Sequence, residues 1–100
     1  MVYPLGYSIG MAHLVQQKSK LKARLKRVRG QIDAVDRALE NEVECSNILQ
    51  LVAAARGGMS ALMAELMTDH LIHHVLEPEH GEDPRAGADE LIDIFRTYLR

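Results

Sequence analysis

The side chains best suited to chemistry in this chain are one cysteine and a pair of histidines. Cys45 is the only cysteine of the 100 residues, and His70 and His74 lie four residues apart. That spacing is close to one helical turn, so on a helix the two imidazoles share a face and can reach one metal ion. Each feature alone has an ordinary alternative, a surface histidine pair or a small buried hydrophobe. Together they predict a transition-metal site.

The separation of these groups along the chain predicts how the site is assembled. Cys45 and His70 are 25 residues apart, so a continuous helix would hold them about 37 Å apart. They cannot share a metal ion within one chain. Two antiparallel copies of the helix would bring Cys45 of one copy beside His70 and His74 of the other, and would cross near Gly57 and Gly58. The sequence therefore predicts an antiparallel dimer with two equivalent intersubunit sites.

Positive charge is concentrated in one segment. Residues 18–29 hold seven of the twelve Lys and Arg residues and no acid, whereas all fourteen Asp and Glu residues lie beyond residue 32. A plain solvated helix face is the alternative interpretation, but such faces usually mix both signs. The separation predicts a surface for a polyanion, with nucleic acid favoured over a membrane surface.

Hydrophobic spacing predicts three helices that position these groups. The first runs from about residue 14 to 42, the second from about residue 45 to 76, and a short third one follows the loop at 77–84, capped by Asp83 or Asp89. The first helix has a heptad seam formed by Leu21, Leu25, Val28, Ile32, Val35 and Leu39. The core residues expected in the second are Leu49, Val52, Leu62, Leu66, Leu71 and Val75. With only 4% aromatic residues, we expect an all-α fold.

The length and the N-terminal composition predict the domain organisation. Residues 1–12 are expected to be a flexible extension, and residues 13–100 a single helical domain. One cysteine cannot form an intrachain disulfide, and neither a secretory leader nor a membrane-spanning run is evident. We expect a soluble cytoplasmic protein. An enzyme is not expected, because no nucleophile has an identifiable base and no phosphate-binding glycine loop occurs.

The chain from His13 to Arg100 resembles the CsoR/RcnR family of bacterial metal-sensing repressors, and most closely its nickel- and cobalt-responsive branch (RcnR/DmeR-like). The resemblance is carried by KLKARLKRVRGQIDAVDRALE, ECSNIL and LVAAARGGMSALMAELMTDHLIHH. It implies a three-helix protomer that forms an antiparallel dimer and then a tetramer. It also implies a repressor that binds operator DNA without metal and is released by metal, so that an efflux gene is expressed.

The resemblance implies a ligand set as well. Cys45 and His70 match ligands of the family, and His74 lies where copper sensors have a second cysteine. Replacing a thiolate by an imidazole shifts preference from Cu(I) toward Ni(II) or Co(II). His13 matches the N-terminal histidine of the nickel and cobalt sensors. Two neighbours could support the site: Glu44, as a hydrogen-bond acceptor or oxygen ligand, and His73, as an additional ligand or base.

The basic segment has a counterpart in the family, whose first helix contacts operator DNA. The matching residues are Lys18, Lys22, Arg24, Arg27 and Arg29, and Gln31 is the nearest amide that could read a base edge. Two alternatives stay open. The first is a formaldehyde-responsive repressor of the same family, and the second is a helical metal-buffering or adaptor protein that does not bind DNA.

Overall fold

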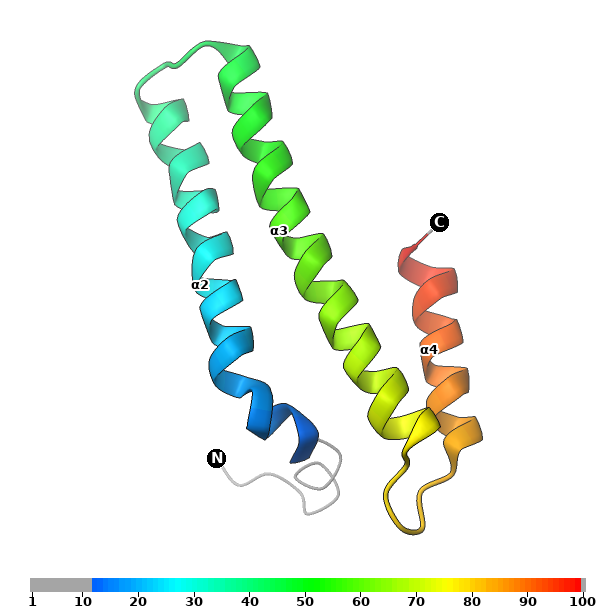
Figure 1. Cartoon of the computed structure of the whole chain (residues 1–100). Coiled ribbons are helices and arrows are strands. Elements are labelled where there is room, and N and C mark those ends of the chain that lie inside the picture. Colours follow the sequence, from blue (N-terminus) through cyan, green and yellow to red (C-terminus); the bar gives the residue numbers. More distant parts are fainter. Residues whose placement is uncertain (1–11, 100) are drawn as a thin grey trace, which may run out of the picture. The chain divides into compact units, whose positions relative to one another are not determined.

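The computed structural model describes the backbone of residues 12–99 and the side chains of residues 17–99. Four elements follow one another, α2 (Ala12–Glu40), α3 (Cys45–Leu71), the π-helix η1 (Ile72–Leu76) and α4 (Pro84–Tyr98) (Figure 1). The described residues contain no strand, so the all-α prediction is confirmed. The predicted extension at residues 1–12 lies outside the described residues except for Ala12.

The chain divides into two compact units, of which one comprises residues 16–63. In this unit α2 and α3 run antiparallel and are joined by the turn at residues 41–44 (Figure 1). The turn closes the end of α2 because the N–H of Val43 donates to the carbonyl of Ala38 and the N–H of Glu42 to that of Leu39. This bond pair is the Schellman arrangement, which requires a left-handed residue. Glu42 takes that role with φ 53°.

Close packing of α2 against α3 in this unit depends on Gly58. A Cβ added there would lie 2.7 Å from Gln31 Oε1 and 2.9 Å from Val28 Cγ2, and Val28 is almost fully buried. At Gly57, by contrast, an added Cβ would meet no described atom within 4 Å. The helix is not interrupted at either glycine. Gly58 is therefore explained by packing within its own chain, whereas Gly57 has no such contact among the described atoms.

Much of the apolar surface of α2 and α3 is not covered by this chain. Leu39 is 58% exposed and Leu49 63% exposed. The core predicted for the second helix is therefore wrong for the single chain. Its members Leu49, Val52, Leu66 and Leu71 are exposed, and Leu62 and Val75 are half-buried. The physical reason is that a helix apolar on several sides needs more than one neighbour.

The other unit contains the described residues from Ala64 onward and the start of α2. Here α3 continues into η1, so the predicted second helix does end at residue 76 but its last five residues form a π-helix. α4 begins at Pro84, and of the two predicted caps it is Asp83 that caps it, since its carboxylate accepts from the N–H of Arg85 at 3.0 Å. None of the described helices is both long and apolar enough to span a bilayer.

Candidate metal site

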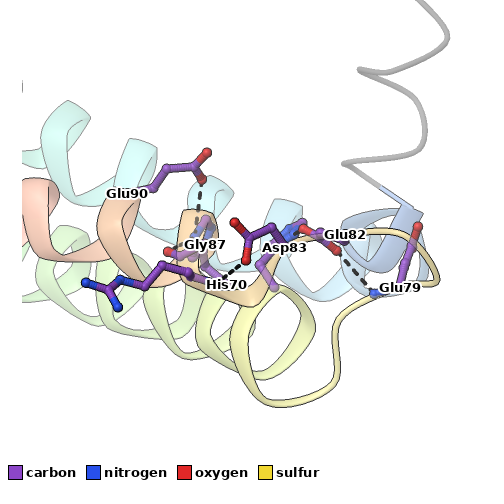
Figure 2. Close-up of polar contacts among 8 residues, drawn as sticks. His70, Glu79, Glu82, Asp83, Gly87 and Glu90 are labelled. Atoms are coloured by element: carbon purple, nitrogen blue, oxygen red, sulfur yellow. Dashed lines mark hydrogen bonds and ion pairs between the residues drawn. The ribbon is translucent and has the colours of Figure 1, made fainter.

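His70 is oriented by α4. Its Nε2 lies 3.0 Å from the carbonyl oxygen of Gly87 and 3.5 Å from Oε2 of Glu90 (Figure 2). A carbonyl only accepts, so Nε2 carries the proton and donates it. The lone pair of the neutral ring is then on Nδ1. This is the arrangement in which metal-binding histidines are held, with one ring nitrogen bonded to a protein acceptor and the other available as ligand.

His74 is oriented by the loop before α4. Its Nδ1 hydrogen-bonds Oε1 of Glu82, and the other oxygen of that carboxylate accepts from the backbone N–H of Glu79 at 3.2 Å. The hydrogen bond from His74 lowers the pKa of Glu82, outweighing the effect of its partial burial. Glu82 is therefore a carboxylate at neutral pH, so it accepts and Nδ1 donates. The lone pair of His74 is then on Nε2.

The two imidazoles lie next to each other. Their ring centroids are 4.7 Å apart and the planes are inclined by 41°. Both side chains are largely buried, His70 being 23% and His74 15% exposed. His74 lies in η1, and π-helical turns of this kind are frequent at functional sites. The arrangement places two imidazoles side by side, and imidazole is a ligand that suits Ni(II), Co(II) or Zn(II).

Gly87 allows α4 to approach this pair closely. An added Cβ would lie 2.4 Å from the carbonyl oxygen of His74 and 2.9 Å from its Cβ. The neighbouring atoms are backbone or attached directly to it, so they cannot move aside cheaply. The absence of a side chain at Gly87 thus brings its carbonyl within hydrogen-bonding distance of His70.

Cys45 lies at the other end of α3, as its first residue, and is exposed and not in a disulfide. Glu44 before it is exposed, and its backbone carbonyl accepts from Asn47 and Ile48 at the helix start. Among the residues that the structure describes, no three His, Cys, Asp or Glu side chains are grouped so as to hold a metal. His13 is in the first turn of α2, but its side chain lies outside the described part.

His73 is engaged elsewhere. Its Nε2 lies 3.5 Å from Oδ1 of Asp69, one turn earlier in α3, and Asp69 is buried. His70 and His74 also have acidic neighbours, but theirs come from α4 and the loop before it, whereas Asp69 lies on α3 itself. The structure therefore gives His73 a separate partner from those of the candidate ligands.

The predicted DNA-contacting residues all lie on α2. Four of them are exposed: Lys18, Lys22, Arg27 and Arg29. Arg24 is half-buried. Gln31 is also half-buried, and its Oε1 lies against Gly58. The exposed cations form the accessible part of this set.

Three residues next to the histidine pair were missed by sequence reasoning, Glu82, Gly87 and Glu90. All come from the segment after the second helix, which the sequence marks only as an acidic loop followed by a capped helix. Glu82 lies eight residues after His74, and no spacing rule predicts that an acid at this distance contacts a helical histidine. A glycine at the fourth position of a helix was the one available signal, because glycine is unfavourable there unless close packing requires it.

Known proteins resemble this chain in sequence and in fold. The family described as metal-sensitive transcriptional repressor matches residues 17–97. An uncharacterised protein from the bioA 5′ region of Serratia marcescens is 35% identical over 91 residues, 90% of this chain and 100% of that protein. The transcriptional repressor RcnR of Salmonella paratyphi B is 31% identical over 90 residues, with the same two coverages. Among solved structures, a variant of the formaldehyde-responsive regulator FrmR from Salmonella enterica serovar Typhimurium matches with TM-score 0.73 and 39% identity, over 84% of this chain and 96% of that one.

Proposed function

Because the chain belongs to the family of metal-sensitive transcriptional repressors, we propose that it binds operator DNA when metal-free and is released by Ni(II) or Co(II). Release would allow expression of a metal efflux gene. The family consists of regulators, so the chain is a regulator and not an enzyme. Binding to DNA gives it a cytoplasmic place of action in a bacterium.

The observation that carries the proposal is the pair His70 and His74. Each ring donates its proton to a protein acceptor, Gly87 or Glu82, and so has its lone pair on the other nitrogen. Cys45 of a second copy would supply a thiolate and His13 a further nitrogen. Such a mixed sulfur and nitrogen set favours Ni(II) and Co(II) over the softer Cu(I). Glu44 and His73 would then lie beside the ligands, as a hydrogen-bond acceptor and a base, without binding the metal ion themselves.

The proposed assembly is an antiparallel dimer, paired into a tetramer. Support comes from the apolar residues of α2 and α3 that this chain leaves exposed, including Leu39 at 58% and Leu49 at 63%. Large apolar side chains gathered on an exposed surface are typical of interaction surfaces. A second copy would cover them and would also bring Cys45 to the histidine pair, which the continuous helix α3 keeps apart within one chain.

The proposed DNA surface is the basic face of α2. The exposed cations Lys18, Lys22, Arg27 and Arg29 would contact phosphates, with Arg24 beside them. For Gln31 to read a base edge, its amide would have to leave Gly58. Metal and DNA would be linked thermodynamically: if metal binds the DNA-free form more tightly, DNA weakens metal binding by the same factor.

An anaerobic titration of the reduced protein with Co(II) tests the metal site. We expect a thiolate-to-metal charge-transfer band that saturates at about one ion per chain, as two equivalent sites per dimer require, and that is lost in Cys45→Ala. Weak d–d bands would indicate more than four ligands and support His13. If Co(II) and Ni(II) fail to bind tightly, the metal assignment is wrong.

A mobility-shift assay on the upstream region of the gene, repeated across salt concentrations, tests the DNA surface. Lys22→Ala should weaken binding and reduce the slope of log K against log salt by about 1 for each subunit whose Lys22 contacts a phosphate. Arg56→Ala removes an exposed charge from α3 instead and should leave the slope unchanged. Affinity that barely depends on salt would contradict DNA binding and favour a metal-buffering or adaptor protein.

A formaldehyde response is the second candidate. It is favoured by the likeness to the formaldehyde-responsive regulator FrmR and by the exposed thiol of Cys45. In that case formaldehyde would release DNA from metal-free protein, and Cys45→Ala would abolish the release. If only Ni(II) or Co(II) releases DNA, the second candidate is excluded.

A further inference from the structure

We propose that Glu82 is a positioning residue for His74, fixing the imidazole as the Nδ1–H tautomer so that Nε2 is the nitrogen presented to a metal ion. The hydrogen bond between His74 Nδ1 and Glu82 Oε1 is the observation that carries it. The part of the proposal that concerns metal rests on the proposed function. The part that concerns the tautomer stands on the metal-free chain.

Glu82 is itself held in place, which a residue that orients another must be. Its second oxygen accepts from the backbone N–H of Glu79 at 3.2 Å. The next residue, Asp83, caps α4, and Pro84 fixes the start of that helix. Four residues into α4, Gly87 packs against the backbone of His74. The carboxylate is therefore held on the loop side by the backbone of Glu79, as Figure 2 shows, and on the helix side by the start of α4 directly after it.

The consequence is that the two imidazoles differ. His70 donates from Nε2 to the carbonyl of Gly87, so its lone pair is on Nδ1. His74 donates from Nδ1 to a carboxylate, so its lone pair is on Nε2. A carboxylate acceptor also makes the ring nitrogen opposite it a stronger donor to a metal ion. Glu82 thus determines both which atom of His74 binds and how strongly.

Imidazole tautomers can be read directly from long-range ¹H–¹⁵N correlation spectra of the full-length, metal-free, reduced protein labelled at histidine nitrogens. The spectra are recorded at mildly alkaline pH, where an ordinary imidazole is neutral, and His74 is assigned with His74→Gln. We expect the Nδ1–H pattern for His74 and the Nε2–H pattern for His70. Glu82→Ala should shift His74 toward the Nε2–H form and leave His70 unchanged.

Glu79→Ala is the matched control, because it removes a carboxylate from the same loop while the backbone N–H that holds Glu82 remains. It should leave the His74 tautomer as in the wild type. Glu82→Gln retains an acceptor oxygen of similar reach, keeps the fold testable if Glu82→Ala is unstable, and should give an intermediate pattern. An Nε2–H or doubly protonated His74 in the wild type, or no change in either Glu82 variant, would overturn the proposal.

Co(II) titrations of the same variants test the second half. Loss of such an outer partner costs about 10–100-fold in metal affinity, so Glu82→Ala should bind Co(II) that much more weakly and Glu79→Ala as tightly as the wild type. Equal affinities of Glu82→Ala and Glu79→Ala would overturn the positioning role. If the wild type itself binds no Co(II), the proposed function fails, while the spectra still decide whether Glu82 fixes His74.

Discussion

The two ends of α3 differ in how much of the proposed metal site this chain builds by itself. At the end that leads into η1, His70 is bonded to Gly87 and His74 to Glu82, and both rings are largely buried. At the other end Cys45 is exposed. The proposed nitrogen ligands are thus oriented by their own chain, whereas the thiol is exposed.

This difference indicates which part of the site depends on assembly. Imidazoles held in one tautomer and one orientation lose little freedom on binding metal, so the histidine end is preorganised. The thiol of Cys45, at the other end of α3, would become part of the site only when a second copy packs against it. Under the proposed function, metal occupancy therefore reports on the contact between two chains as well as on metal concentration.

The strongest test of this comparison is to separate the two ends onto different chains. Cys45→Ala and the double variant His70→Ala, His74→Ala should each lose Co(II) affinity by more than the roughly 100-fold upper range for an outer partner. Co-produced, the two variants should regain about a quarter of the wild-type charge-transfer intensity. Half of randomly paired dimers are mixed, and each mixed dimer has one intact site of two.

Two controls accompany this mixture. Each variant alone should give no band, and an equal mixture of wild type and Cys45→Ala should give about half the wild-type intensity however the chains pair, because each wild-type thiol completes one site. A mixture without any band would mean that Cys45 does not meet the histidines of another chain. A band from the double variant alone would mean that Cys45 binds metal without them.

A smaller effect is expected from adding a methyl group where α4 approaches His74 most closely. Gly87→Ala should lower the free energy of unfolding by about 1–3 kcal/mol, the usual cost of overpacking, since the new methyl would meet the backbone of His74. Urea denaturation followed by circular dichroism at a fixed protein concentration measures it.

Gly30→Ala is the matched control for that variant. Gly30 lies within α2 and an added Cβ would meet no described atom within 4 Å. Alanine is the better helix former by about 1 kcal/mol, so this variant should be stabilised. If Gly87→Ala is stabilised to the same extent, α4 does not approach His74 closely in solution.

Local patterns of the sequence were sufficient for the helices and for the start of α4. The three helices follow from hydrophobic spacing, and Asp83 before Pro84 is a cap signal that acts within one turn. The spacing of His70 and His74 is also local. Their partners Gly87 and Glu82 are not, because they reach the histidines only after α4 has folded back on η1, and no spacing rule describes that approach.

The core predicted for the second helix is not formed within the single chain, for a related reason. The apolar composition of that helix predicts burial of Leu49 and Val52, and both are exposed in the single chain. Composition predicts that a surface will be buried and does not say by which chain. Gly58 illustrates the opposite case: a small residue expected at a contact between two chains packs on Gln31 and Val28 of its own.

The smallest predicted effect concerns the thiol end, where the turn before Cys45 contains a residue in an unfavourable conformation. Glu42 has φ 53° at the position of the Schellman turn where glycine is usual. A left-handed conformation costs a residue with a Cβ roughly 1–2 kcal/mol, and glycine would remove this cost. Part of the resulting stabilisation is offset because glycine is more flexible in the unfolded chain. Glu42→Gly should therefore stabilise the protein by up to about 1 kcal/mol, measured by the same denaturation. Glu40→Gly, which places the same residue at the last position of α2, should destabilise the protein.

The Co(II) affinity of Glu42→Gly should match the wild type, because the turn before Cys45 contains none of the proposed ligands. A weaker affinity would mean that this turn, and therefore the chain itself, also positions the thiol of Cys45 for metal binding.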